Sequence, residues 1–213
     1  MTGKPLWITC YNFKNMGIKK RFADYYKKGY MPWVHENPDF NLVEMVERWP
    51  IKPCKTLEMG CGTGVDAVWL ASQKFDVTAC DISEIAIEIA KKNLPGDMNN
   101  CKFHVLDCMN DPIPGAPFGF VFDRGYFHSN RTAMSRKRLA KKIADTLELG
   151  GLWLNISGSF DGAKRETGPP RMKAKEIISA AEKYFKVLSI NATHFGSDQE
   201  DPARAWVSLF RKR

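Results

Sequence analysis

Three glycines alternate with other residues in the stretch Glu58-Met-Gly-Cys-Gly-Thr-Gly64, and such a stretch could bind a nucleotide-like ligand. A short apolar run precedes it, and residues 65–71 have the apolar spacing of a helix. Glycine permits a sharp turn and lets a ligand approach the bare backbone. A strand, a glycine turn and a helix N-terminus in this order hold a ligand at the edge of a sheet. We therefore expect a ligand-binding loop formed by Gly60, Cys61, Gly62 and Gly64.

Two other loop motifs do not fit this stretch. A dinucleotide fingerprint has Gly or Ala at the sixth position counted from Gly60, where this chain has Val65. A Walker loop ends in Gly-Lys-Ser/Thr, which is absent here. The pattern Glu-x-Gly-x-Gly-x-Gly resembles motif I of the class I S-adenosylmethionine-dependent methyltransferases. The resemblance implies that Glu58 and the glycine loop bind S-adenosylmethionine.

Two aspartates end the next two expected strands. Asp81 follows residues 75–80, and its carboxylate can accept charge-assisted hydrogen bonds from both ribose hydroxyls of an adenosine. Asp107 follows residues 101–106, and the resemblance implies contact with the adenine amine, with Cys108 giving a backbone N–H to the ring. Asp107 could instead simply form a turn before Pro112. Ile82 and Met109 would then contact the two faces of the adenine.

The fourth expected strand ends in Asp123-Arg124-Gly125, and His128 follows closely. The Asn/Asp-Pro-Pro-Tyr/Phe motif of nucleobase amino-methyltransferases is missing here. Arg124 could stabilise a thiolate or bind a substrate carboxylate, or it could form a structural salt bridge with Asp123 or Glu58. His128 could be a base near neutral pH or a structural hydrogen-bonding group. We assign Arg124 and His128 to catalysis and Asp123 to cofactor binding.

Several of these stretches together resemble the thiopurine S-methyltransferase family and its bacterial relatives. The matching stretches run from about residue 22 to 210 and include Tyr25-Tyr26-x-x-Gly-x-x-Pro-Trp33, Asp123-Arg124-Gly125, Leu149-Gly-Gly151 and Gly168-Pro-Pro-Arg171. The resemblance implies that Tyr26 and Trp33 cover the bound cofactor. It also implies a sheet of strand order 3-2-1-4-5-7-6 with strand 7 antiparallel. Family members methylate small thiols, selenols, halides or metalloid oxyanions.

The elements that position these residues alternate between short apolar strands and amphipathic helices, which predicts an α/β fold with a doubly wound, mostly parallel, Rossmann-like sheet of seven strands. We expect strands near 55–60, 75–81, 101–107, 118–123, 151–157, 186–193 and 204–210. We expect helices near 18–28, 40–49, 64–74, 83–93, 131–148 and 173–185. The chain is interpreted as one domain, 1–213, with a Rossmann-like core at 51–213. Residues 1–50 would form a helical, aromatic lid over the cofactor or simply cover the sheet edge.

Composition places the chain among globular enzymes, since 44% of its 213 residues are hydrophobic and 26% are charged. Six cysteines without a Cys-x-x-Cys pair predict reduced thiols in a cytoplasmic protein and no metal site. No stretch is long and apolar enough for a membrane helix. The net charge of +8, with a basic run at 131–142, could indicate an anionic partner or a solvated helix face.

We therefore expect a methyltransferase of the EC 2.1.1 class that uses S-adenosylmethionine on a small-molecule acceptor, above all a thiol. The alternatives are an RNA or protein methyltransferase that uses the basic helix, and a non-catalytic S-adenosylmethionine-binding module.

Overall fold

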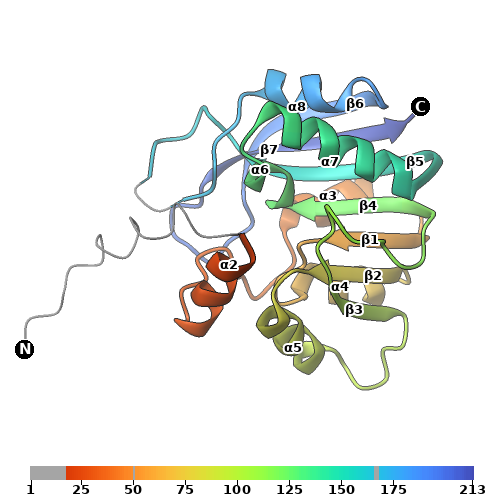
Figure 1. The fold of residues 1–213 in the computed structure, drawn as a ribbon, viewed down its shortest axis with the longest axis vertical. Coiled ribbons are helices and arrows are strands. Elements are labelled where there is room, and N and C mark those ends of the chain that lie inside the picture. The colour runs from red at the N-terminus through yellow and green to blue at the C-terminus, as the bar shows by residue number, and fades with distance from the viewer. Residues whose placement is uncertain (1–17, 50, 166–167) are drawn as a thin grey trace, which may run out of the picture.

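The computed structural model describes residues 18–49, 51–165 and 168–213. Its centre is a seven-stranded sheet of order β3-β2-β1-β4-β5-β7-β6 (Figure 1). Strand β7 pairs antiparallel with both β5 and β6, and the other pairs are parallel, so the expected order and direction are confirmed. The strands are β1 (Lys55–Met59), β2 (Asp76–Asp81), β3 (Cys101–Val105), β4 (Phe118–Arg124), β5 (Leu147–Gly158), β6 (Phe185–His194) and β7 (Arg204–Lys212).

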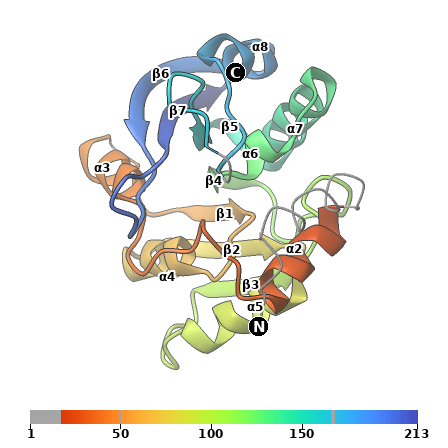
Figure 2. The same ribbon diagram turned by 90° about the vertical axis from the view of Figure 1, so that its left-hand side faces the viewer.

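Helices cover both faces of the sheet (Figure 2). One face packs against α3 (Phe40–Arg48), α4 (Val65–Ser72) and α5 (Glu84–Asn93). The other face packs against α6 (Tyr126–Ser129), α7 (Ala133–Thr146) and α8 (Ala174–Ala181). Helix α2 (Ile18–Lys27) lies close to β2 and β3 in Figure 2 and contacts α5. In the part of the chain that the structure describes, no helix is long and apolar enough to cross a membrane.

The sequences of the central strands are continuous apolar runs because both faces of these strands are buried. In β4, Phe120 and Phe122 belong to the core beneath α3–α5, whereas Phe118 and Val121 belong to the core beneath α6–α8. This double burial fixes β4 in the sheet, with Arg124 at its carboxyl end.

Polar side chains set the start of the helices around the site. Asp39 caps α3 by accepting a hydrogen bond from the Asn41 N–H. The Ser83 hydroxyl caps α5 by accepting from the Ala86 N–H at 3.3 Å. Both helices therefore begin at the carboxyl edge of the sheet with their orientation fixed.

Several expected boundaries are wrong, among them the end of the helix expected over 173–185, which lies at Ala181. The helix expected over 131–148 ends at Thr146, and β5 begins at Leu147, so Gly150-Gly151 lies within the strand. The cause is a pairing of Leu147 with Phe118, followed by an irregularity that brings Leu152 opposite Phe120. Strand β3 ends at Val105, two residues before Asp107, and the four-residue helix α6 was not expected.

Candidate active site

The glycine loop leaves β1 at Gly60 and enters α4 after Gly64. The N–H groups of Gly60 and Cys61 donate to the Cys80 carbonyl on β2 at 2.7 and 3.0 Å. Gly60 has a φ of 73°, and a Cβ added there would lie 2.9 Å from Tyr126 Cδ2. Glycine is therefore required at position 60 by both the backbone and the packed ring.

The Asp81 carboxylate lies against the same loop. Its Oδ2 accepts from the Gly62 N–H at 3.0 Å, and its Oδ1 accepts from the Ser83 N–H at 2.8 Å. Burial raises the pKa of Asp81, and these backbone hydrogen bonds oppose the rise. Asp81 thus ties the glycine loop to the start of α5, at the place where the sequence predicts ribose binding.

Asp107 forms a turn just beyond β3. Its two oxygens accept from the Met109 N–H at 2.9 Å and from the Asn110 amide at 2.7 Å. Cys108 is buried in the core beneath α6–α8, where its hydrogen bond with Cys80 and its burial raise its pKa. The turn role of Asp107 is therefore seen directly, and contact with adenine stays a prediction, as it does for Ile82 and Met109.

Aromatic side chains from the N-terminal segment reach the glycine loop. The Tyr26 hydroxyl lies 3.2 Å from the position that a Cβ on Gly62 would occupy, and the Trp33 indole N–H donates to this hydroxyl at 3.4 Å. Burial raises the pKa of Tyr26, and the charge of Asp81 raises it further. The structure thus brings Tyr26 and Trp33 to the loop. Residues 1–17 and 50 of the expected lid segment lie outside the described residues.

Arg124 connects three segments that are far apart in the chain. Its Nε donates to Asp39 Oδ2 at 2.7 Å, its Nη1 to the Trp33 carbonyl at 3.0 Å, and its Nη2 to the Gly196 carbonyl. The side chain is only 10% exposed. The suggested structural partners, Asp123 and Glu58, were wrong, because the ion pair forms with Asp39.

Asp123 is buried among hydrogen-bond donors. It accepts from the Trp153 indole at 2.8 Å, from the Asn155 amide at 3.0 and 3.2 Å, and from the Phe127 N–H at 2.9 Å. Burial raises its pKa to about 6. These contacts give Asp123 a structural role at the β4–α6 junction, while its contact with cofactor stays a prediction.

His128 does not have the properties expected of a base near neutral pH. Its Nδ1 accepts a hydrogen bond from the Gly158 N–H at 3.0 Å. Burial, with a contribution from the charge of Arg124, lowers its pKa to about 3. The ring is therefore neutral at physiological pH and has its unprotonated nitrogen occupied, which corrects the proposed base role in favour of structural hydrogen bonding.

Glu58 is 3% exposed, and its Oε2 has no hydrogen-bond partner among the described residues. Burial is the main cause of a raised pKa at Glu58, and the nearby charge of Asp66 adds to it. A buried carboxylate oxygen without a donor is unusual in a native fold and calls for a ligand or water as its partner. Glu58 therefore fits a site for a cationic or hydrogen-bond-donating ligand group.

Four further residues belong to the site and were not assigned from the sequence. Asp66 accepts from the Asp39 N–H at 2.8 Å and lies 3.6 Å from His35 Nε2, so it joins α4 to the N-terminal segment. Asp39 could have been found from the sequence because it directly precedes an expected helix, and Tyr126 because it directly follows Asp123-Arg124-Gly125. Asp66 lies close after the glycine loop and could also have been found, whereas no neighbouring residue indicates a role for His35.

Comparison with known proteins identifies the class. Residues 56–151 match a family model described as a methyltransferase domain. The chain is 41% identical over 85 residues to magnesium-protoporphyrin O-methyltransferase of Rhodobacter capsulatus, a match that spans 38% of each chain. It is 28% identical over 167 residues to probable thiol methyltransferase 2 of Arabidopsis thaliana, covering 76% of this chain and 69% of that protein.

The fold agrees with these matches. The crystal structure of magnesium protoporphyrin IX methyltransferase from Synechocystis, solved with bound S-adenosylmethionine, superposes with a TM-score of 0.69 at 12% identity. The superposition covers 94% of this chain and 99% of that one. Residues 56–151 therefore form a methyltransferase domain, and the matched proteins point to S-adenosylmethionine as its methyl donor.

Proposed function

We propose that this protein transfers the methyl group of S-adenosylmethionine to a small, soft nucleophile, specifically a thiol. The observation that carries the proposal is the state of the polar groups around the end of β4. Arg124 is bound to Asp39, both oxygens of Asp123 accept hydrogen bonds, and His128 is held neutral with Nδ1 occupied. Each of these three side chains is therefore engaged within the protein, and none of the three is free to act as a general base.

A thiol does not need such a base. A free thiol ionises near a pKa of about 8.5, so a few per cent is already thiolate at neutral pH, whereas an alcohol must lose its proton to a base. Methyl transfer then depends on aligning and desolvating the thiolate against the donor methyl group. The buried surroundings of β4 suit that task.

The residues of the glycine loop would hold the donor, which supplies the methyl group. The unpartnered Oε2 of Glu58 fits the ammonium of the methionine part, because that group brings both a positive charge and N–H donors. Asp81 would accept from the ribose, Asp107 and Cys108 would contact the adenine edge, and Ile82 and Met109 its faces. Tyr26 and Trp33, which lie against the glycine loop, would exclude water from the bound donor.

Two sequence relationships support the thiol assignment. The Arabidopsis relative, named a probable thiol methyltransferase, aligns over two thirds of its length. The Asp-Arg-Gly and N-terminal aromatic stretches resemble the thiopurine S-methyltransferase family.

The RNA alternative loses support because the charges of the basic helix are engaged. Arg136 pairs with Glu176 at 2.9 Å and Lys141 pairs with Asp145 at 2.6 Å. Arg138 donates to the Asn110 side chain and Lys142 to the Asp111 carbonyl. Two cations of α7, Arg136 and Lys141, thus have a carboxylate partner within the protein, so we propose a small-molecule acceptor.

The proposal is tested by the pH dependence of kcat/KM for a series of thiols that differ in their own pKa. We expect the rate to rise with pH at a midpoint that follows the thiol, with no inflection near 6.5. The alcohol analogue of each thiol should not react. A midpoint that stays at one pH for all thiols would show an enzyme base, and methylation of RNA in preference to thiols would overturn the assignment.

A further inference from the structure

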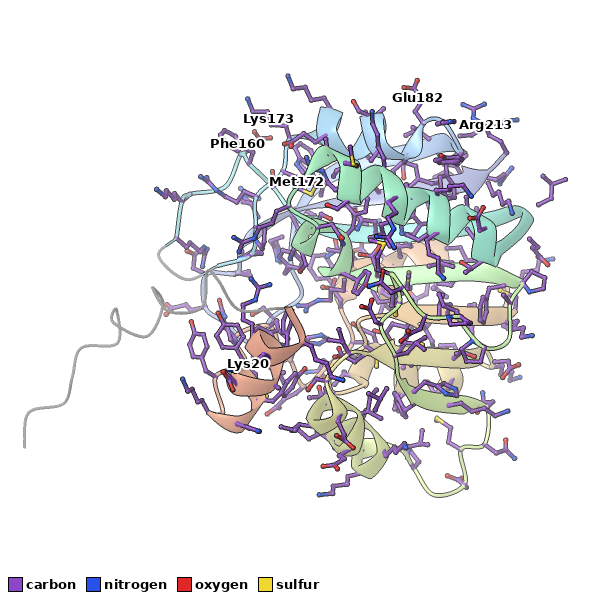
Figure 3. The ribbon with its side chains drawn as sticks, viewed as in Figure 1. Lys20, Phe160, Met172, Lys173, Glu182 and Arg213 are labelled. Carbon is purple, nitrogen blue, oxygen red and sulfur yellow. The ribbon has the colours of Figure 1, made fainter. Side chains whose placement is uncertain are left out.

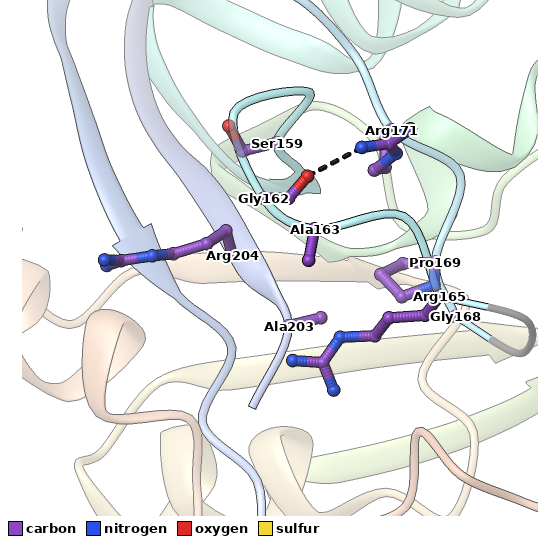
Figure 4. Close-up of a pocket in the computed structure, with 9 residues that line it drawn as sticks. All are labelled: Ser159, Gly162, Ala163, Arg165, Gly168, Pro169, Arg171, Ala203 and Arg204. Carbon is purple, nitrogen blue, oxygen red and sulfur yellow. Dashed lines mark hydrogen bonds between the residues drawn. The ribbon is translucent and has the colours of Figure 1, made fainter. Parts of the chain in front are cut away.

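A small cavity opens just beyond the carboxyl end of β5, between residues 159–165 and 168–171 on one side and the start of β7 on the other (Figure 4). Its volume is about 40 Å³. Its lining includes Ser159, Gly162, Arg165, Pro169, Arg171 and Arg204, and we call it the arginine cavity. It is separate from the glycine loop, and it includes Gly168, Pro169 and Arg171 of the Gly168-Pro-Pro-Arg171 stretch, to which we assigned no role from the sequence.

The volume limits what the cavity can hold. One water needs roughly 10–15 Å³ measured in this way, so the arginine cavity has room for about three waters. That space matches a carboxylate or a similar small oxyanion group, and it is too small for a complete cofactor. The cavity is therefore suited to one end of a ligand whose remainder lies elsewhere.

Arg171 gives the cavity a fixed positive charge. Its Nη1 donates to the Gly162 carbonyl at 2.6 Å and to the Phe160 carbonyl at 3.4 Å, and these two bonds orient the guanidinium. Neither partner carries a charge, and within the described ranges no carboxylate pairs with Arg171. A guanidinium has five N–H donors, so Nε and Nη2 can still donate to an anion.

Other cations surround Arg171. Its guanidinium lies 5.0 Å from the centre of the half-exposed Phe160 ring, and the Lys173 ammonium lies 4.9 Å from the same ring. Figure 3 shows Phe160, Met172 and Lys173 gathered on one side of the molecule. Arg165 also lines the cavity, where its only carboxylate partner among the described residues, Asp201, is 90% exposed. This concentration of positive charge favours an anionic occupant.

The cavity lies next to the end of β4. Ser159 of its wall follows Gly158, whose N–H donates to His128. Ala203 of its wall accepts a hydrogen bond from Phe195, and the Phe195 ring lies 5.2 Å from the Arg124 guanidinium. Neighbouring strands are about 4.8 Å apart, so an acceptor at β4 can extend one strand further to reach the cavity beyond β5.

We propose that the arginine cavity binds the carboxylate of an anionic methyl acceptor, with Arg171 as its main donor. This inference rests on the proposed function, and it names the substrate class as thiols that carry a carboxylate a few bonds away from the sulfur. Arg171 fixes one end of the acceptor while the thiolate approaches the donor methyl group. The cavity therefore sets specificity and leaves the methyl transfer itself unchanged.

The first test compares ω-mercaptocarboxylates of increasing chain length with the mercaptoalcohols of the same length. We expect one chain length at which the carboxylate lowers KM markedly. Arg171→Met should raise KM for that acceptor about tenfold or more, because a charge-assisted hydrogen bond is lost, and should leave KM for the mercaptoalcohol nearly unchanged. Arg171→Lys keeps the positive charge but lacks the planar guanidinium, so its KM for that acceptor should lie between those of the native enzyme and Arg171→Met.

Arg204→Met is the matched control. Arg204 lines the same cavity, but its guanidinium extends away from it in Figure 4. This substitution removes the same charge without removing a donor that faces the anion, so KM should change little. Equal KM effects of Arg171→Met and Arg204→Met would overturn direct recognition by Arg171, as would equal KM values for the carboxylate and alcohol series in the native enzyme.

A second measurement separates this inference from the proposed function. Propionate added to the native, donor-free protein should shift the NMR signals of the Arg171 Nε–H and the Gly162 N–H, with no shift in the Arg171→Met protein. If these shifts occur but no thiol is methylated, the cavity assignment stands and the thiol assignment fails. If thiols are methylated without carboxylate preference and propionate causes no shift, the cavity assignment fails and the thiol assignment stands.

Discussion

Asp81 illustrates how one side chain can serve both the fold and the donor. Its two oxygens already accept hydrogen bonds from Gly62 and Ser83, and a carboxylate oxygen has room for a second donor. A ribose can therefore add to this arrangement without displacing it. From the sequence alone, Asp81 was expected only to bind ligand; the structure gives it a part in shaping the loop.

Replacing Asp81 with Ala should accordingly have two effects. The affinity for S-adenosylhomocysteine should fall at least tenfold, because charge-assisted hydrogen bonds to the ribose are lost. The Tm without ligand should also fall, since the Gly62 and Ser83 N–H groups lose their acceptor. Calorimetry and thermal denaturation measure the two effects, and unchanged affinity would place the ribose on another residue.

His128 and Asp123 give the stability of the protein an opposed dependence on pH. The pKa of His128 falls from 6.5 to about 3 on folding, so below pH 6.5 the unfolded chain binds a proton that the folded chain does not. This contribution to the free energy of unfolding is present above pH 6.5 and is lost as the pH falls toward 3. The pKa of Asp123 rises from 3.8 to about 6, so its contribution increases as the pH falls from 6 toward 3.8.

The variant His128→Asn removes only the first of these contributions. Between pH 7.5 and 4.5 the native protein should lose about 2–3 kcal/mol more of its free energy of unfolding than the variant loses. Asn can still accept from the Gly158 N–H, which limits the structural disturbance. Urea denaturation at the two pH values measures the difference, and parallel losses in both proteins would contradict the lowered pKa.

At the scale of elements, hydrogen bonds from Arg124 hold the N-terminal segment and the loop after β6 against the end of β4. A second set of hydrogen bonds joins the same parts, since Glu36 donates from its N–H to Asp198, and Gln199 donates to the Pro32 carbonyl. These bonds are exposed, whereas the Arg124–Asp39 pair is buried. The buried pair is therefore the stronger constraint on how the N-terminal segment sits over the glycine loop.

Arg124→Met should release this constraint. Removing one partner of a buried ion pair costs about 3–5 kcal/mol because the remaining charge, here that of Asp39, is left without its partner. Hydrogen exchange should accelerate in residues 29–41 and 194–203 and change little in β1 and β2. The control is Arg48→Met, which breaks an exposed pair with Glu44. If hydrogen exchange in Arg124→Met is unchanged, or is faster throughout the protein, Arg124 does not stabilise these two segments specifically.

Residues 22–35, which include Tyr26 and Trp33, are expected to respond to ligand binding. If residues 22–35 close over the donor, S-adenosylhomocysteine should slow their hydrogen exchange beyond the protection seen in the free protein. Tyr26→Phe, which keeps the ring and removes the hydroxyl that Trp33 donates to, should reduce the gain in protection. Equal protection with and without ligand would leave Tyr26 and Trp33 as packing residues.

For the whole molecule, the sequence predicted the sheet order but not the long-range polar contacts. The alternation of strands and helices predicted a doubly wound, mostly parallel sheet, and the strand order was implied by the resemblance carried by the glycine and Asp-Arg-Gly motifs. The partner of Arg124 lies 85 residues earlier in the chain, and no local pattern indicates such a pairing. The start of β5 was missed for the same reason, because Leu147 becomes a strand residue only through its pairing with Phe118. The neutral state of His128 depends on burial, which its immediate neighbours in sequence do not reveal.

The last prediction concerns ligand selectivity of the whole fold. A ligand that binds only the folded state at a hundred times its Kd adds about 2.7 kcal/mol to the free energy of unfolding. For a chain of this size that gain corresponds to a rise in Tm of about 5–10 °C. S-adenosylmethionine and S-adenosylhomocysteine should both produce the rise, because the ammonium and ribose that we expect Glu58 and Asp81 to bind are present in both ligands. NAD should produce none, because Val65 stands where a dinucleotide fingerprint has Gly or Ala. Stabilisation by NAD without stabilisation by S-adenosylhomocysteine would contradict the assignment of the glycine loop.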